Sequence, residues 1–122
     1  MKLLIVDDSS MLRDMLTYAL NEGGYNEVTE AVDGLDGLNA VKENQYDLLI
    51  VDYNMPNMNG IEMIIEIRKL QNYKNIPIFI LTTERSDDLK HEAKSAGANG
   101  WITKPFVPDQ LLKAVNTVLI KK

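Results

Sequence analysis

The sequence predicts an α/β fold in which helices cover both faces of a parallel sheet. Residues 3–6, 48–51 and 78–81 are uninterrupted runs of branched or aromatic apolar residues, and runs of this kind are typical of strands buried on both faces. The segments between them have the apolar spacing of helices. Strands and helices alternate five times along the chain, which favours a parallel sheet with right-handed crossovers.

Length and composition narrow the classes of function. The chain is expected to form one domain over residues 1–122. Its formal net charge of -5 argues against a nucleic-acid-binding surface. Cysteine is absent and His91 is the only histidine, which excludes thiolate and multi-histidine metal sites and argues against a Ser-His-Asp triad. The sequence shows no leader-like segment and no apolar run of membrane-spanning length, so we expect a soluble, cytoplasmic protein.

The first strand–helix unit carries an acidic pair. Residues 3–6 end in Asp7 and Asp8, and Ser10 is placed to cap the helix that follows. The next strand, residues 27–31, alternates polar and apolar side chains, as is typical of a strand at the edge of a sheet. The inward stripe expected on the first helix consists of Met11, Leu12, Met15, Leu16, Ala19 and Leu20.

The second helix leads into the strand that we expect at the centre of the sheet. Gly37 within this helix costs about 1 kcal/mol of helix stability, which only close packing explains. The central strand, residues 48–51, ends in Asp52 and a turn. This carboxylate is either a turn cap or a functional group at the edge where ligands of α/β sheets bind. The inward face of the second helix is expected to consist of Leu35, Leu38 and Val41.

The second half of the chain adds a hydroxyl and an ammonium group at strand ends. A helix begins after Gly60 and is predicted to turn Arg68 toward water, and the strand that follows ends in Thr82. After another helix, the short strand 100–103 runs into Lys104, and a last amphipathic helix follows. The inward face of the helix after Gly60 is expected to consist of Ile61, Ile64, Ile67 and Leu70.

Polar side chains from four strand ends are predicted to converge, because parallel strands all end at the same edge of a sheet. These residues are Asp7, Asp8, Asp52, Thr82 and Lys104. Three carboxylates repel one another unless a cation lies among them, and oxygen ligands suit Mg²⁺. A metal ion and a lysine together suit a phosphoryl group, which a carboxylate can attack in line.

Four motifs resemble those of the two-component response-regulator receiver family. They are VDDSS at 6–10, VDYNMPNMNG at 51–60, LTTE at 81–84 and GWITKPF at 100–106. Each motif alone is weak, but four in the same order and at matching intervals are specific. The resemblance spans nearly the whole chain and is greatest to stand-alone chemotaxis regulators of the CheY type. It implies a flavodoxin-like sheet of five strands in the order 2-1-3-4-5 with five flanking helices, for which CheY is itself a standard example.

The resemblance implies an acidic phosphorylation site. Asp52 is then the phosphoacceptor, which takes a phosphoryl group from a phosphohistidine of a CheA-like sensor histidine kinase. Mg²⁺ is then held by Asp7, Asp8, a carboxylate oxygen of Asp52 and the backbone carbonyl of Asn54. The side chains of Asn54 and Glu84 flank the phosphoryl position and are expected to tune the rate of its hydrolysis.

The same resemblance implies a switch beside that site. Lys104 is expected to contact the phosphoryl group, and the peptide bond between Lys104 and Pro105 is expected to be cis. Thr82 is expected to move toward the phosphoryl group on activation, with Trp101 moving inward in concert. As residues alone, Thr82 is also an ordinary strand residue and Trp101 an ordinary core aromatic.

The function implied by the resemblance is a monomeric signalling switch, whose own chemistry is limited to accepting and losing the phosphoryl group rather than to enzymatic turnover. Its output face is formed by the fourth helix, the last strand and the last helix. The partner implied for this face is a flagellar motor switch protein, and a phosphatase is a further candidate partner. A surface that binds an acidic motor peptide is expected to be basic, but Asp87 and Asp88 make the start of the fourth helix acidic.

Other functions stay open at this point. One is a stand-alone receiver that acts as a phosphate sink or relay in a pathway other than chemotaxis. Another is a small Mg²⁺-dependent phosphatase with an aspartate nucleophile, although such an enzyme normally has a second acid where Asn54 stands. A third is a flavin- or nucleotide-binding module, against which the missing G-x-G-x-x-G motif argues.

Overall fold

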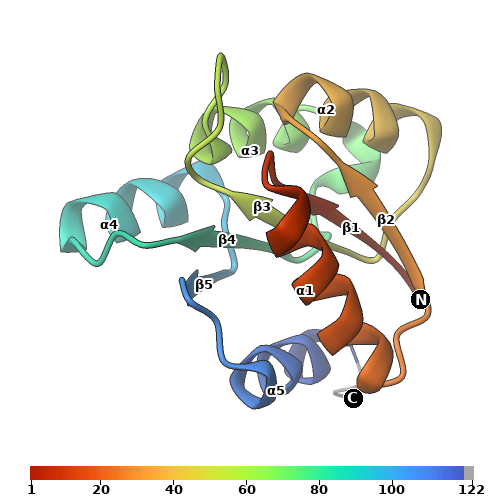
Figure 1. Cartoon of the computed structure of the whole chain (residues 1–122). Helices are drawn as coiled ribbons and strands as arrows, with labels where there is room; N and C mark the ends of the chain where they lie inside the picture. The colour runs from red at the N-terminus through yellow and green to blue at the C-terminus, as the bar shows by residue number, and fades with distance from the viewer. Residues whose placement is uncertain (120–122) are drawn as a thin grey trace.

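Five parallel strands form one sheet in the order β2-β1-β3-β4-β5 in the computed structural model, which describes residues 1–119 (Figure 1). The strands are β1 (Lys2–Val6), β2 (Glu27–Ala31), β3 (Leu48–Asp52), β4 (Ile78–Thr82) and β5 (Gly100–Thr103). The helices are α1 (Ser10–Glu22), α2 (Gly34–Glu43), α3 (Gly60–Arg68), α4 (Asp87–Ala96) and α5 (Pro108–Leu119), with a short 3-10 helix η1 (Gln71–Tyr73). The predicted fold class and strand order are confirmed.

The sheet separates two apolar cores. Alternate residues of β1 point to opposite faces, so that Leu4 and Val6 pack toward α2, α3 and α4, whereas Leu3 and Ile5 pack toward α1 and α5. The central strands β1, β3 and β4 are buried along their whole length, except for Lys2 at the start of β1. Full burial of each such aliphatic side chain stabilises the fold by about 2 kcal/mol.

The predicted apolar stripe of α1 is partly wrong. Met11 is 72 % exposed and Met15 is 50 % exposed, whereas Leu16 and Leu20 are fully buried. A helix that packs on one sheet buries only a narrow strip of its surface, so the outer members of a broad apolar stripe stay in solvent. The same is true of Leu35 on α2, which the sequence placed inward and which is exposed.

The cap of α1 also differs from the prediction. Ser9, not Ser10, is the N-cap residue, and its side chain accepts a hydrogen bond from the backbone N–H of Leu12 at 3.2 Å. A capping hydroxyl must precede the first helical residue to reach the free N–H groups of the first turn. The helix therefore begins at Ser10, one residue earlier than it would if Ser10 were the cap.

Gly37 lies where α2 approaches α3 and β1 most closely. A Cβ atom at this position would lie 2.4 Å from Cε of Met63 and 3.0 Å from a methyl carbon of Val6. A side chain would thus clash with both, and the helix accepts the cost of glycine in exchange for this close contact. This explains the glycine that the sequence pattern left unexplained.

Arg68 does not face water as predicted. Its guanidinium reaches the loops that precede β4 and β5, where it donates to the carbonyl oxygens of Tyr73 at 2.6 Å, Ile76 at 2.8 Å and Gly97 at 2.6 Å. It also donates to Oδ1 of Asn99 at 2.8 Å. Arg68 therefore ties the end of α3 to the edge of the sheet where the strands begin.

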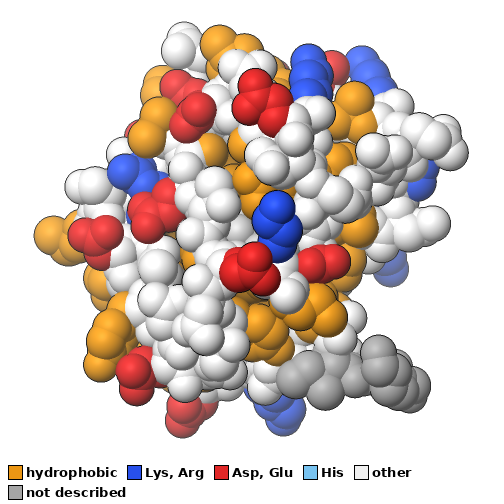
Figure 2. Space-filling model, turned by 90° about the vertical axis from the view of Figure 1, so that its right-hand side faces the viewer, with side chains coloured by type: hydrophobic (Ala, Val, Ile, Leu, Met, Phe, Trp, Pro, Cys, Tyr) orange, Lys and Arg blue, Asp and Glu red, His pale blue; other side chains and the backbone are white. Residues whose placement is uncertain are grey.

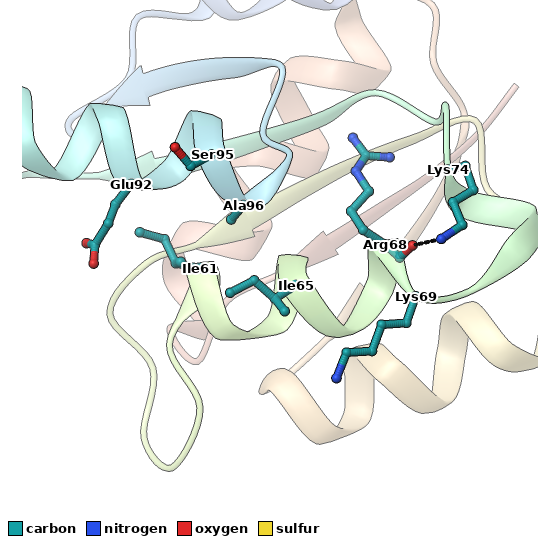
Figure 3. A pocket seen from close by; sticks show the side chains of 8 residues that line it. All are labelled: Ile61, Ile65, Arg68, Lys69, Lys74, Glu92, Ser95 and Ala96. Carbon is teal, nitrogen blue, oxygen red and sulfur yellow. Dashed lines mark hydrogen bonds between the residues drawn. The ribbon is translucent and has the colours of Figure 1, made fainter.

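A groove of about 480 Å³ lies between α3 and α4 (Figure 3). Ile61 and Ile65 of α3 and Ala96 of α4 form its apolar part, and Lys74 closes one end by donating to the backbone carbonyl of Arg68 at 2.8 Å. The groove brings together no cluster of acids comparable to that at the strand ends. Within residues 1–119, the acidic cluster is therefore the stronger candidate for chemistry.

The side of the molecule where the strands begin is shown in Figure 2, turned from the view of Figure 1. Acidic and basic side chains are interspersed on this face, with apolar side chains between them. The residues that the structure describes on this face therefore form no broad basic field of the kind that nucleic-acid binding needs. Every helix within residues 1–119 is too short or too polar to span a lipid bilayer.

Candidate functional site

The strand ends bring the predicted polar residues together at one edge of the sheet. Asp52 is the last residue of β3 and pairs with Leu81 in β4, and Thr82 ends β4 opposite Thr103. Asp7 follows β1 directly, and its backbone N–H donates to the carbonyl of Ala31 at 3.1 Å. The ends of β3 and β4 lie on the left of Figure 1, on the side of α4. The parallel strand direction therefore explains why residues so far apart in sequence meet.

Three carboxylates and one ammonium group form the centre of the site. Oxygen atoms of Asp7, Asp8 and Asp52 lie within 4.8 Å of one another. Nζ of Lys104 lies 2.6 Å from Oδ1 of Asp52 and 3.8 Å from Oδ2 of Asp7. The cluster therefore holds more negative than positive charge.

Burial differs sharply among these residues. Asp7 and Asp52 are each only 1 % exposed and Thr82 is completely buried, but Asp8 is exposed. Of the acidic pair at the end of β1, only Asp7 is therefore buried, whereas Asp8 lies further along the loop and is exposed. The exposure of Asp8 gives the cluster a side that is open to solvent.

Burial also changes the protonation of the acids. It raises the pKa of Asp52 to about 6, with repulsion from Asp7 acting in the same direction and the contact with Lys104 opposing it. Burial likewise raises the pKa of Asp7, although the hydrogen bond from the backbone N–H of Ser9 at 2.9 Å opposes the shift. Both charges are therefore incompletely compensated by the chain itself.

The carboxylates fit a hard divalent cation. Among residues 1–119, Oδ2 of Asp7 is buried and accepts no hydrogen bond, and Oδ1 of Asp52 has no partner besides the ammonium group of Lys104. An unsatisfied buried carboxylate oxygen is costly, and a bound cation would remove that cost. Oxygen-only ligands with an open side for water suit Mg²⁺ better than a softer metal ion.

Two of the predicted flanking residues border the cluster without joining it. Asn54 lies exposed in the loop after β3. Glu84 is also exposed, and its backbone N–H donates to the hydroxyl oxygen of Thr82 at 3.0 Å. The Thr82 hydroxyl is thus engaged with its own loop, beside the aspartates but turned toward the start of α4.

Trp101 lies in β5, and Lys104 directly follows that strand. Trp101 is half-buried in β5, and its Nε1 has no hydrogen-bond partner among the described residues. Nζ of Lys90, on α4, lies 5.7 Å from the centre of its ring, a distance typical of a cation–π contact. The peptide bond between Lys104 and Pro105 is cis.

Two residues that shape the site were not identified from the sequence. A Cβ atom on Gly60 would lie 2.6 Å from the carbonyl oxygen of Asp52, so only glycine lets α3 start this close to the end of β3. Arg13 donates from Nη1 to the carbonyl oxygen of Asp7 at 2.6 Å. The sequence pattern identified Gly60 only as a turn residue. For Arg13, the available signal was its position in the first turns of the helix that follows the acidic pair.

Comparison with known proteins agrees with this geometry. The family model described as "Response regulator receiver domain" matches residues 3–116. The chain is 37 % identical to chemotaxis protein CheY-3 of Vibrio cholerae serotype O1 over 118 residues, which cover 97 % of this chain and 91 % of that protein.

Solved structures give the same result. The chain superposes on V. cholerae chemotaxis protein CheY4 with a TM-score of 0.92 and 44 % identity, covering 97 % of this chain and 98 % of that one. It superposes with a TM-score of 0.87 and 26 % identity on the receiver domain of sensor histidine kinase PA1611 from Pseudomonas aeruginosa PAO1, covering 96 % and 95 %. That structure has a magnesium ion coordinated in its active-site cleft. The chain therefore belongs to the response regulator receiver family, and its curated relatives are chemotaxis proteins of the CheY type.

Proposed function

We propose that this protein is a phosphorylation-activated signalling switch in which Asp52 accepts a phosphoryl group from a phosphohistidine of a sensor histidine kinase. The observation that carries the proposal is the contact of 2.6 Å between the buried Asp52 carboxylate and Lys104, beside two further carboxylates. Membership of the receiver family supports it. Residues 1–122 would act as one receiver unit.

The transfer would proceed by attack of a carboxylate oxygen of Asp52 on phosphorus. A P–O bond forms, the P–N bond of the phosphohistidine breaks, and the imidazole nitrogen keeps the electron pair of that bond. Because the pKa of Asp52 is about 6, the nucleophile is mostly ionised at neutral pH. Lys104 is placed to form an ion pair with an oxygen of the transferred group.

Asp7, Asp8, a carboxylate oxygen of Asp52 and the backbone carbonyl of Asn54 would hold Mg²⁺. When bound, the ion supplies charge neutralisation for the phosphoryl oxygens. Two observations support this ligand set, namely the buried Oδ2 of Asp7, which accepts no hydrogen bond from the described residues, and the coordinated magnesium ion in the PA1611 receiver domain. The side chains of Asn54 and Glu84, both exposed at the rim, would set how fast water removes the phosphoryl group.

The switch would run from Thr82 to Trp101. The Thr82 hydroxyl would leave the N–H of Glu84 and donate to the phosphoryl group, and Trp101 would move inward in concert. Ile80 pairs with Trp101 and Thr82 pairs with Thr103, so the two side chains lie on adjacent strands. The result would be a shift in population toward a form in which α4, β5 and α5 bind a target.

The names of the curated relatives favour a chemotaxis pathway. The donor would then be a CheA-like kinase and the target a flagellar motor switch protein, with a phosphatase as a further partner. The chain would act as a switch with limited phosphoryl chemistry rather than as an enzyme that turns over a substrate.

The deciding experiment is intact-mass spectrometry after incubation with acetyl phosphate and Mg²⁺. We expect the wild-type protein to gain one phosphoryl group, and we expect no gain in the Asp52→Asn variant or in EDTA. Asp14→Asn, which removes an exposed carboxylate on α1, is the matched control and should be labelled like the wild type. Labelling of Asp52→Asn, or labelling that persists in EDTA, would contradict the proposal.

Trp101 allows a second test, because it is the only tryptophan in the chain. Its fluorescence should change when Asp52 is phosphorylated. In Thr82→Ala we expect the same mass gain but a much smaller fluorescence change, because the hydroxyl group that would couple phosphorylated Asp52 to Trp101 is missing. An unaltered fluorescence change in Thr82→Ala would exclude Thr82 from the switch.

A further inference from the structure

Arg13, on the second turn of α1, reaches back to the acidic loop that follows β1. Its Nη1 donates to the main-chain carbonyl of Asp7 at 2.6 Å, and its Nε lies 3.0 Å from Oε1 of Glu30 on β2. The side chain of Arg13 is only 14 % exposed. The second carboxylate oxygen of Glu30 accepts a hydrogen bond from Thr17 at 3.1 Å, which fixes the partner of the guanidinium in turn.

These contacts fix the peptide group that joins Asp7 to Asp8. The N–H of Asp7 donates to Ala31 at 3.1 Å, and its carbonyl accepts from Arg13, so the backbone is held on both sides. A peptide group is planar, so an anchored carbonyl of Asp7 also sets the direction of the N–H of Asp8. The Asp8 side chain is exposed, and the direction in which it leaves the chain follows from this backbone.

We propose that Arg13 is a positioning residue for the divalent-cation site, and that it acts by anchoring the Asp7–Asp8 peptide group. This inference rests on the proposed Mg²⁺ site at Asp7, Asp8 and Asp52. Groups that orient metal ligands typically change metal affinity by about 10- to 100-fold when they are removed. Arg13 reaches the backbone between two ligands, not a ligand atom, so we expect an effect at the lower end of this range.

The charge of Arg13 makes the inference testable by its sign. A guanidinium beside a cation site repels the cation, so removal of its charge alone would strengthen Mg²⁺ binding. A positioning role predicts the opposite, namely weaker binding. Lysine keeps the charge but has no planar fork, so it cannot hold Asp7 and Glu30 in the same geometry.

The experiment is a titration of ¹⁵N-labelled protein with MgCl₂, in which the amide shifts of the loop after β1 give the dissociation constant. Against the wild type, we expect Arg13→Gln and Arg13→Lys to raise the Mg²⁺ dissociation constant by about tenfold. Glu30→Gln keeps an acceptor for Nε of Arg13 and does not alter the hydrogen bond from Arg13 to the carbonyl of Asp7. Its Mg²⁺ dissociation constant should therefore stay within about twofold of the wild-type value. Lys42→Gln removes an exposed cation at the far end of α2 and controls for net charge.

Several results would overturn the inference. An unchanged or lower Mg²⁺ dissociation constant in Arg13→Gln would show that Arg13 affects Mg²⁺ binding only through its charge or through global stability. A wild-type dissociation constant in Arg13→Lys would show the same. The amide spectra and urea unfolding in EDTA show whether each variant is folded. If Arg13→Gln does not fold, the Mg²⁺ dissociation constant of Arg13→Lys still tests the inference. Failure of the wild type itself to bind Mg²⁺ would refute the proposed metal site together with this inference, whereas normal binding in both Arg13 variants refutes the inference alone.

Discussion

Arg68 is half-buried and Asp52 is buried, at opposite edges of the same sheet, and the chain treats the two charges differently. The guanidinium of Arg68, where the strands begin, donates to four oxygen atoms of the surrounding loops. The carboxylate of Asp52, where the strands end, contacts a single ammonium group, and one oxygen of the adjacent Asp7 accepts no hydrogen bond from the described residues. Burial disfavours the charge in both cases, since it lowers the pKa of Arg68 and raises that of Asp52 to about 6.

The difference separates a structural charge from a functional one. The partners of Arg68 are all supplied by the chain, so nothing from outside is needed to compensate its burial. Asp7 and Asp52 repel each other and share a single ammonium group, so the fold is less stable there until a ligand arrives. The edge where the strands begin should therefore determine stability, and the edge where they end should respond to ligands and pH.

Replacement of Arg68 should have the largest effect on stability. Arg68→Ala leaves the carbonyls of Tyr73, Ile76 and Gly97 without their donor, so we expect the free energy of unfolding to fall by about 3 kcal/mol. Urea denaturation measures this change. Mg²⁺ affinity should stay at the wild-type value, and a loss of Mg²⁺ binding in the folded variant would mean that the two edges are not independent.

Asp52→Asn should instead stabilise the metal-free protein. The folded-state pKa of about 6 lies above the ordinary 3.8, so the folded chain binds the proton more tightly than the unfolded chain does. The stability associated with this proton is complete at low pH and is lost as the pH rises through the interval from 3.8 to about 6. In EDTA, the advantage of Asp52→Asn should therefore be about 2 kcal/mol larger near pH 7.5 than near pH 4.5.

Urea titrations of both proteins at the two pH values measure this difference. An advantage that grows toward low pH would mean that Lys104 compensates the charge of Asp52 fully, contrary to the comparison with Arg68.

The contrast also shows how far the sequence could lead. Asp52, Thr82 and Lys104 could be placed together because a pattern of buried strands fixes the edge at which each strand ends. The order of the strands came from the resemblance to receivers, and the chemical roles of these residues stay predictions. Arg68 could not be identified, because helical periodicity turns it toward water and only the loops before β4 and β5 supply its partners.

Exposure was the least predictable property. Met11 and Met15 satisfy the helical apolar pattern as well as Leu16 does, yet they are exposed because α1 packs with only part of its surface. Asp8 follows Asp7 directly, yet it is exposed because the chain leaves the sheet between them. Periodicity gives the direction of a side chain within its element but not the extent to which neighbouring elements cover it.

Mg²⁺ should stabilise the end of the strands by a smaller amount. A ligand that binds only the folded state at about ten times its dissociation constant adds about 1.4 kcal/mol to the free energy of unfolding. We expect this increase in the wild type and in Arg68→Ala, measured by urea denaturation with and without MgCl₂, with NaCl of equal ionic strength as the control. An equal increase in Asp7→Asn would attribute the effect to salt rather than to the acidic cluster.

The exposed ion pair between Glu66 and Lys69 on α3 provides the smallest expected effect. Its atoms are 2.9 Å apart, only slightly further than the contacts of Arg68, but both side chains are exposed. Water competes for such charges, so Glu66→Gln should change the free energy of unfolding by less than about 0.5 kcal/mol. If urea denaturation instead gave a loss comparable to that of Arg68→Ala, distance rather than burial would control the value of these contacts. The contrast between the two edges would then lose its physical basis, since it assumes that a charge matters most where water cannot reach it.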